Sequence, residues 1–168
     1  MKAYIASPLG FSEAGRNFYQ NEFLRRISCE LGYDVLDPWK LTPSDLIASA
    51  SALRFGVRQR NRWRVVNQSI GLTNQCAIEQ CDILIAILDG TDVDSGTASE
   101  IGYAAAKGKK IEAYRGDFRL SADNCGSTVN LQVEHFIRMG GGQIASSLDE
   151  LVVRLLERFG PQSIQPYP

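Results

Sequence analysis

Residues 83–88 read Ile-Leu-Ile-Ala-Ile-Leu, an uninterrupted apolar run that only a few kinds of fold can bury. A strand made of these residues has no polar face, so other elements have to cover it on both sides. Such strands occur in parallel sheets that carry helices on both faces. Asp89 and Gly90 follow directly, so the run ends in a polar loop. The run therefore predicts a central strand of an α/β domain.

Strand patterns and helix patterns alternate along the chain. We expect strands at residues 3–6, 33–36, 83–88, 110–114 and 143–145. Periodic apolar residues and capping signals predict helices at residues 12–32, 63–81, 97–107 and 148–158. Residues 40–62 are less regular, and we expect a long connection with some helix there. The alternation predicts a flavodoxin-like domain, a doubly wound sheet of five parallel strands with helices on both faces.

The composition is that of a globular protein, with 44% hydrophobic and 22% charged residues. A chain of 168 residues fits one domain, which we place at residues 1–160. The Pro-rich residues 161–168 are expected to form a flexible tail. The formal net charge of −1 argues against a nucleic-acid partner. Because the sequence has no 18-residue apolar run and no signal-peptide pattern, we expect a cytoplasmic protein without a membrane partner.

Two groups of residues could form sites of their own. The four cysteines contain no CxxC pair and only His135 could join them as a histidine ligand, so we expect reduced thiols and no metal. Five arginines crowd the segment before the 63–81 helix: Arg54, Arg58, Arg60, Arg62 and Arg64. They could bind phosphate or RNA. The near-neutral net charge favours a solvated face or a subunit contact instead.

Ligands of an open parallel sheet bind beyond the carboxyl ends of the strands, where the strand order reverses. Three loops are expected to converge at that edge, namely residues 7–12, 37–40 and 89–97. The third loop is the most acidic, with Asp89, Asp92 and Asp94. We therefore expect a ligand site at these loops.

Glu100 follows the third loop and is surrounded by small residues. We expect Gly96 to allow a tight turn, which places Glu100 in the first turn of a helix. There the helix dipole and the free N–H groups favour an ionised carboxylate. A carboxylate at the ligand edge of the sheet suits a nucleophile. An acid in a first turn is also common as a simple dipole partner or cap, and the spacing alone leaves both interpretations open.

Residues 94–104, Asp-Ser-Gly-Thr-Ala-Ser-Glu-Ile-Gly-Tyr-Ala, resemble the signature of the nucleoside 2-deoxyribosyltransferases. The opening Tyr4-Ile5-Ala6-Ser7-Pro8 resembles the first strand and loop of that family. Asn74 lies where the family has the helix that feeds the third strand. Val129-Asn130-Leu131 resembles a late element that reaches into a neighbouring subunit's site. The matches extend from residue 4 to about residue 131.

The resemblance implies a double displacement at the anomeric carbon of the sugar. Glu100 would attack C1′ and expel the base, and a second base would then attack from the same side, so configuration is retained, as in retaining glycosidases. Tyr4 would hydrogen-bond and orient Glu100. Asp94 would accept a hydrogen bond from the 5′-hydroxyl, and Asn130 of a neighbouring chain could add to that grip. The implied substrates are nucleosides and free nucleobases, without a cofactor.

The base side of the site is expected to contain aromatic residues. Phe11 and Trp39 could stack on a nucleobase, with Gly10 beside them, although core packing is the alternative for both rings. Asp92 and Gly96 are the further expected substrate-binding residues in the third loop.

Asn74 departs from the family pattern, because many members carry Asp at this position. An amide cannot act as a general acid, although it can hydrogen-bond a ring nitrogen and its neighbour. Asn74 also lies on an apolar stripe, so it could be a satisfied buried amide. If it contacts the base, the leaving base has to take its proton from Asp92, from water or from another group.

The sequence leaves three interpretations of function open. The resemblance favours a transferase that forms at least a dimer and up to a hexamer. A related class of hydrolases cleaves 2′-deoxynucleoside 5′-monophosphates and tends to carry Ser at the position of Asp94. A carboxylate there repels phosphate and accepts a hydrogen bond from a free 5′-hydroxyl, which favours nucleosides. A non-catalytic nucleoside-binding module is the third interpretation, but it would not require Glu100 together with Tyr4.

Overall fold

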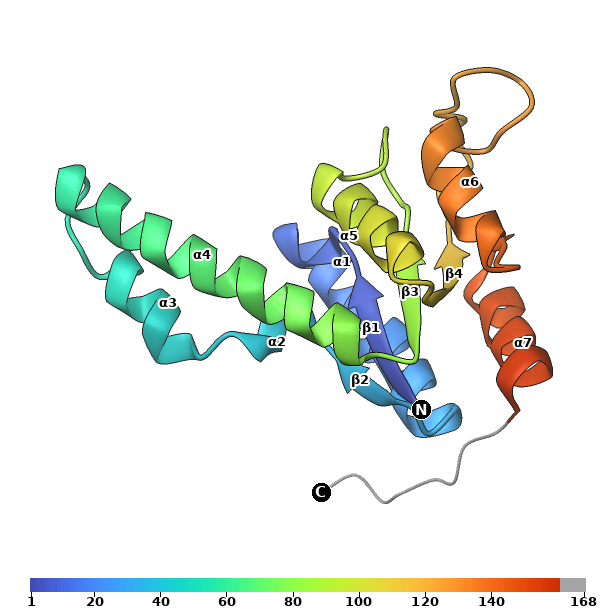
Figure 1. Cartoon of the computed structure of the whole chain (residues 1–168), viewed down its shortest axis with the longest axis horizontal. Helices are drawn as coiled ribbons and strands as arrows, with labels where there is room; N and C mark the ends of the chain where they lie inside the picture. The colour runs from blue at the N-terminus through green and yellow to red at the C-terminus, as the bar shows by residue number, and fades with distance from the viewer. Residues whose placement is uncertain (161–168) are drawn as a thin grey trace.

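A parallel sheet organises the chain, as the computed structural model shows for the residues that it describes, 1–160 (Figure 1). The predicted tail at 161–168 lies outside these residues. The described part forms one five-stranded sheet in the order β2-β1-β3-β4-β5. Its strands are β1 (Lys2–Ala6), β2 (Asp34–Leu36), β3 (Ile83–Ile87), β4 (Lys110–Tyr114) and β5 (Ile144–Ala145). All neighbouring strands pair in parallel, so the predicted flavodoxin-like fold is confirmed.

Helices pack on both faces of the sheet. One face is covered by a continuous helical segment and the last helix: α1 (Glu13–Phe18), the π-helical η2 (Tyr19–Leu24) and η3 (Arg26–Glu30), and α7 (Leu148–Phe159). The other face is covered by α4 (Val57–Gln80), α5 (Ser95–Ala106) and α6 (Leu131–Met139). Short helices complete the connections: η1 (Leu9–Phe11), α2 (Pro38–Leu41) and α3 (Ser44–Ser51).

Strand β3 shows why its sequence is apolar throughout. Ile83, Ile85 and Ile87 point into the core beneath η2, η3 and α7. Leu84 and Ala86 point into the other core, beneath α4, α5 and α6. Every residue of the strand is fully buried. Because burying one large apolar side chain stabilises a fold by roughly 1.5–3 kcal/mol, this strand is a major source of stability.

Two helices differ from the sequence predictions. Helix α4 begins at Val57, six residues before the predicted start, and forms a hairpin with α3. The apolar stripe does not reveal this outer end because it projects away from the sheet, and Val57 and Val65 are exposed there (Figure 1). Helix α6 was not predicted, although Val133 and Ile137 supply a short buried stripe.

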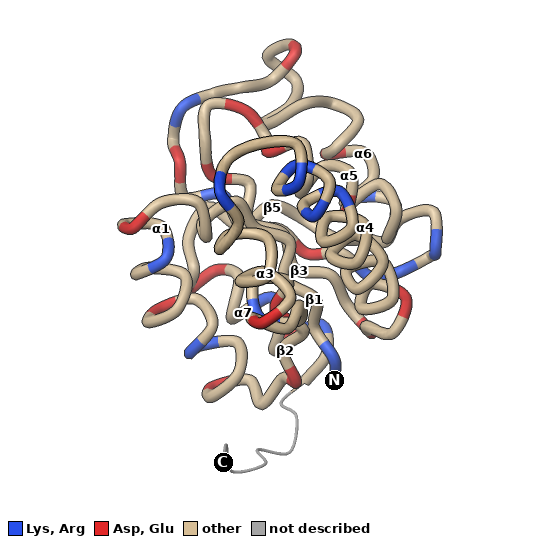
Figure 2. Tube along the Cα trace, turned by 90° about the vertical axis from the view of Figure 1, so that its left-hand side faces the viewer, with Lys and Arg blue, Asp and Glu red and all other residues tan. Residues whose placement is uncertain are grey.

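The five arginines of residues 54–64 lie in the link between α3 and α4 and in the first turns of α4. Figure 2 shows positively charged segments gathered around this hairpin. Two of these side chains donate hydrogen bonds to nearby residues, Arg62 to the Ser49 hydroxyl at 2.9 Å and Arg64 to the Asn61 amide oxygen at 3.1 Å.

Within residues 1–160, no helix combines the length and the apolar character needed to cross a membrane.

Candidate active site

The carboxyl ends of β1 and β3 are neighbours, and the residues expected to react lie beside them. Tyr4 is on β1 and pairs in register with Leu84 of β3, while Glu100 is on α5, which packs against both strands. The Tyr4 hydroxyl donates a hydrogen bond of 2.6 Å to Glu100 Oε1. Residues 96 positions apart in the sequence are thereby joined at the edge where a ligand of such a sheet is expected.

Burial is the main influence on Glu100. It raises the pKa of the Glu100 carboxyl to about 7, with a smaller contribution in the same direction from Asp94, while the hydrogen bond from Tyr4 opposes the rise. Burial, and then the charge of Glu100, raise the pKa of Tyr4 above its usual value. Tyr4 therefore stays protonated and acts as a donor, while Glu100 titrates near neutral pH.

The position of Glu100 in its helix differs from our expectation. Helix α5 begins at Ser95, so Glu100 is its sixth residue and lies beyond the first turn. The stabilising effect of a helix dipole on a carboxylate falls off within the first turn. The interpretation of Glu100 as a helix cap is therefore wrong, and so is the expectation that the dipole keeps it ionised.

Asp94 is the residue that caps α5. Its Oδ2 atom accepts hydrogen bonds from the Thr97 backbone N–H at 3.0 Å and from the Thr97 hydroxyl at 3.4 Å. A Cβ atom at Gly96 would lie 3.0 Å from the same Oδ2 atom, so glycine leaves this carboxylate room. Asp92 is exposed in the preceding loop, and its Oδ1 atom accepts a 2.7 Å hydrogen bond from the Val93 N–H.

Phe11 and Trp39 form an aromatic pair at the ends of β1 and β2. Their ring centres lie 4.9 Å apart at an interplanar angle of 85°. Phe11 is 73% exposed and Trp39 is 41% exposed, so core packing does not account for either ring. Gly10 is buried against Trp39, and a Cβ atom there would come within 2.1 Å of the indole ring. Only glycine lets the backbone approach this ring so closely.

Asn74 lies on the inner half of α4, and its Oδ1 atom is buried without a hydrogen-bond partner among the described residues. The interpretation as a satisfied buried amide is therefore wrong for this oxygen. Leaving such an acceptor unpaired costs about 1–3 kcal/mol, so a ligand or a water molecule is expected to pair with it.

Asn130 serves a local purpose in this chain. It is the N-cap of α6, and its Oδ1 atom accepts hydrogen bonds from the backbone N–H groups of Gln132 and Val133 at 3.0 and 3.3 Å. The amide nitrogen is not used by this cap. Any contact of Asn130 with a neighbouring subunit has to use that nitrogen or replace the cap.

A second tyrosine–carboxylate pair at this edge was not foreseen. The Tyr19 hydroxyl of η2 donates a 2.9 Å hydrogen bond to Asp37 Oδ1, which also accepts from the Trp39 N–H at 3.1 Å. Asp37 is 5% exposed, and its Oδ2 atom has no partner within residues 1–160. The sequence signal was the Asp37-Pro38 pair, which is typical of a helix start.

Together these residues make a partly buried carboxylate with a pKa raised to about 7, a tyrosine that hydrogen-bonds to it, a second carboxylate nearby and an exposed aromatic pair. Perturbed carboxylates of this kind cluster at catalytic sites. In the described part of the chain, no three His, Cys, Asp or Glu side chains are placed to share a metal ion. Fold and site thus define an α/β protein with a carboxylate centre at the carboxyl edge of its sheet.

Comparison with known proteins identifies the family. The model of the nucleoside 2-deoxyribosyltransferase family matches residues 3–136. The chain therefore belongs to the nucleoside 2-deoxyribosyltransferase family, whose members are enzymes that act on nucleosides and nucleobases. A search of curated protein sequences finds no match.

Solved structures share the whole fold. A conserved protein from Enterococcus faecalis V583 is 25% identical, with a TM-score of 0.68 over 95% of this chain and 99% of the other. A 2-desoxiribosyltransferase from Leishmania mexicana is also 25% identical, with a TM-score of 0.61 over 94% and 98% of the two chains. A CMP N-glycosidase from Clostridium botulinum, at 20% identity and a TM-score of 0.51 over 92% and 97%, shows the shared fold alone.

Proposed function

We propose that this enzyme exchanges the nucleobase of 2′-deoxyribonucleosides through a covalent deoxyribosyl–Glu100 intermediate, with retention of configuration. The observation that carries the proposal is the partly buried Glu100 carboxylate, held by a 2.6 Å hydrogen bond from Tyr4. Because the pKa of Glu100 is about 7, a large share of molecules carry the ionised nucleophile at neutral pH.

In the first step, one carboxylate oxygen of Glu100 bonds to C1′ while the bond between C1′ and the base nitrogen breaks. The electron pair of that bond leaves with the base. Tyr4 binds Oε1, so Oε2, which accepts no hydrogen bond among the described residues, is the oxygen available for the attack. In the second step an incoming base attacks C1′ and releases Glu100. Two displacements on one carbon return the original configuration, as in retaining glycosidases.

The base side of the reaction would use the aromatic pair and Asn74. Phe11 and Trp39 present ring surface on which a nucleobase can stack. The unpaired Oδ1 atom of Asn74 is an acceptor for an N–H group of the base. Because an amide cannot supply a proton, the leaving base takes it from Asp92, from solvent or from another acid.

Asp94 would select the 5′ end of the substrate. Its carboxylate is an acceptor for a free 5′-hydroxyl and would repel a 5′-phosphate. The cap on α5 fixes Oδ2, and no hydrogen bond to Oδ1 is present among the described residues. The expected substrates are therefore nucleosides. Hydrolysis is the second candidate function, in which water replaces the incoming base in the same second step.

We also propose that the enzyme is a dimer or a larger assembly, with residues 1–160 of each chain as one domain. The support is the resemblance of residues 129–131 to an element that completes a neighbouring site. The amide nitrogen of Asn130 makes no hydrogen bond within residues 1–160 and is the group available for such a contact.

A two-base exchange assay tests the function. A deoxynucleoside is mixed with a different free base, and the products are separated chromatographically for the wild type, Glu100→Gln and Glu157→Gln. The wild type and Glu157→Gln, a change at an exposed residue of α7, should form the new nucleoside. Glu100→Gln should reduce exchange by about a thousandfold or more. Exchange that survives in Glu100→Gln excludes this nucleophile, and sugar release without a new nucleoside favours the hydrolase.

A further inference from the structure

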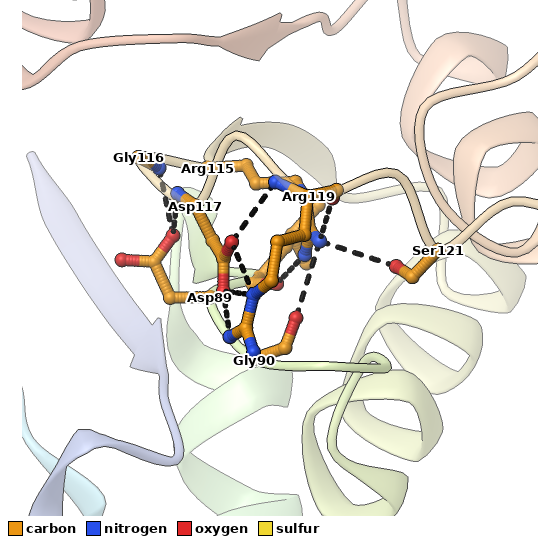
Figure 3. Close-up of polar contacts among 8 residues, drawn as sticks. Asp89, Gly90, Arg115, Gly116, Asp117, Arg119 and Ser121 are labelled. Atoms are coloured by element: carbon orange, nitrogen blue, oxygen red, sulfur yellow. Dashed lines mark hydrogen bonds and ion pairs between the residues drawn. The ribbon is translucent and has the colours of Figure 1, made fainter.

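Two loops that leave neighbouring strands are tied together by Arg115 (Figure 3). Arg115 follows β4 and is 4% exposed. Its guanidinium donates hydrogen bonds to the backbone oxygens of Leu88 and, at 3.1 Å, Gly90 in the loop after β3. On its own loop it binds the Arg119 backbone oxygen at 2.7 Å and the Ser121 hydroxyl at 3.2 Å. One side chain thus holds both loops.

Asp89 connects the same two loops in the opposite direction, from the loop after β3 to the loop after β4. It lies between the two residues of the β3 loop whose oxygens Arg115 binds. Its Oδ1 atom accepts hydrogen bonds from the backbone N–H groups of Gly116 and Asp117 at 2.7 and 2.9 Å (Figure 3). Each loop therefore contributes one charged side chain that binds the backbone of the other, and we call Arg115 and Asp89 the interloop clamp.

The clamp is an unusual use of a buried cation. No carboxylate in residues 1–160 forms an ion pair with Arg115, and its charge is met by neutral oxygens together with the more distant Asp117. A charge buried in this way is costly unless its hydrogen bonds are well formed. An arginine that serves only to fill space could be replaced by an apolar residue at lower cost, so its several fixed donors point to a positioning task.

The clamp acts on the segment that ends at Asp94. Gly90 is bound by Arg115 and has a φ of +138°, and only residues 91–93 separate it from the α5 cap at Asp94. Glu100 is anchored separately, through α5 and the hydrogen bond from Tyr4. Loosening the clamp would therefore disturb Asp94 more than Glu100.

We propose that Arg115 is a positioning residue that sets the 5′ side of the nucleoside site by fixing the 88–94 loop and, through it, Asp94. This inference rests on the proposed function. It assigns specificity to the residue that directly follows β4, outside the three loops expected at the site. The hydrogen bond between the 5′-hydroxyl and Asp94 depends on the interloop clamp, whereas the attack by Glu100 does not.

The test compares two substrates, a 2′-deoxynucleoside and the same compound without its 5′-hydroxyl. Arg115→Lys keeps the charge but lacks the planar fork. Its kcat/KM for the 2′-deoxynucleoside should fall by about tenfold or more, mainly through KM, and by less than about twofold for the 5′-deoxy compound. A general loss of folding would lower both equally. The pH profile of kcat should keep a midpoint near pH 7, because burial, the main influence on the pKa of Glu100, and the hydrogen bond from Tyr4 are unchanged.

A double-mutant cycle separates positioning from mere stability. Asp94→Ser keeps a capping hydroxyl but removes the carboxylate. If Arg115 acts through Asp94, adding Arg115→Lys to Asp94→Ser should change kcat/KM for the 2′-deoxynucleoside by less than about twofold. Arg119→Lys is the matched control, because Arg119 is an exposed arginine of the same loop that pairs with Asp117. Its kinetics should stay at wild-type values.

Ser121→Ala removes one acceptor of Arg115 and tests the same point if Arg115→Lys does not fold. It should also lower kcat/KM for the 2′-deoxynucleoside more than kcat/KM for the 5′-deoxy compound. Equal losses on both substrates, or additive losses in the cycle, overturn the positioning proposal while leaving the transferase in place. A wild-type enzyme that acts on neither substrate refutes the proposed function itself.

Discussion

The hydroxyl of Tyr4 lies 2.6 Å from Glu100 Oε1 and joins the first strand of the sheet to the helix that follows the third. This contact orients the carboxylate and lowers its pKa. Burial makes ionisation of Glu100 harder, and the tyrosine offsets part of that effect. The balance between the two gives a carboxylate that ionises near neutral pH without being fully solvated, as the proposed nucleophile requires.

The rate should depend on the ionisation of Glu100. In the proposed mechanism only the ionised carboxylate attacks C1′. We therefore expect kcat/KM to rise with pH and to level off above a midpoint near pH 7, the value to which burial raises this pKa. Rates measured from pH 5 to pH 9 on one deoxynucleoside check this. A profile that stays flat between pH 5 and pH 7 contradicts the assigned titration.

Tyr4→Phe should move that midpoint upward. The tyrosine hydrogen bond lowers the pKa of Glu100, so its loss leaves burial less opposed. The variant should lose more activity at pH 6 than at pH 9. Tyr33→Phe is a suitable control, because the Tyr33 hydroxyl is buried and has no hydrogen-bond partner among the described residues. A midpoint that falls in Tyr4→Phe would show that the hydroxyl does not stabilise the carboxylate.

Glu100 should also reduce stability at alkaline pH. Its folded-state pKa of about 7 is above the ordinary value of 4.5, so the folded state holds the proton more tightly than the unfolded chain does. The corresponding stability is complete below about pH 4.5 and is lost as the pH rises through 7. Glu100→Gln removes this loss. We expect the variant to be more stable at pH 8, by on the order of 1–3 kcal/mol, and the difference to shrink at pH 5. Urea unfolding at the two pH values measures it, and an equal difference at both contradicts the argument.

Gly10→Ala should disturb the base side. The new Cβ atom would lie 2.1 Å from the Trp39 ring, so the indole has to move. We expect a higher KM for the incoming base and altered tryptophan fluorescence, with a smaller effect on the pH profile. Gly71→Ala is the matched control, because a Cβ atom at that helical position meets nothing within 4 Å. It should leave the kinetics unchanged and stabilise α4 by about 0.5–1 kcal/mol.

Asp94→Ser should broaden the substrate range at the 5′ end. Serine can still cap α5, so the helix start is preserved. Removing the carboxylate removes repulsion of a phosphate dianion. The ratio of kcat/KM for a 5′-monophosphate to that for its nucleoside should rise by about tenfold or more. An unchanged ratio would mean that Asp94 does not face the 5′ position.

Much of the fold was predictable because its signals are local. The apolar run at 83–88 requires cover on both sides, and the alternation of strands and helices then leaves little choice of architecture. Helix α6 and the first six residues of α4 were missed for a related reason. Helix α6 is short, and the start of α4 projects from the sheet, so neither segment has a long stripe of buried apolar residues.

The sequence by itself determined the sheet and the identity of the candidate groups, including Tyr4, Asp94 and Glu100. It did so because backbone periodicity and motif spacing are properties of neighbouring residues. Only the tertiary structure decided that Asp94 is the helix cap, that burial raises the pKa of Glu100 to about 7, and that Arg115 joins two loops. Desolvation and long-range hydrogen bonds depend on which distant residues close over a group, and local sequence patterns carry no record of that.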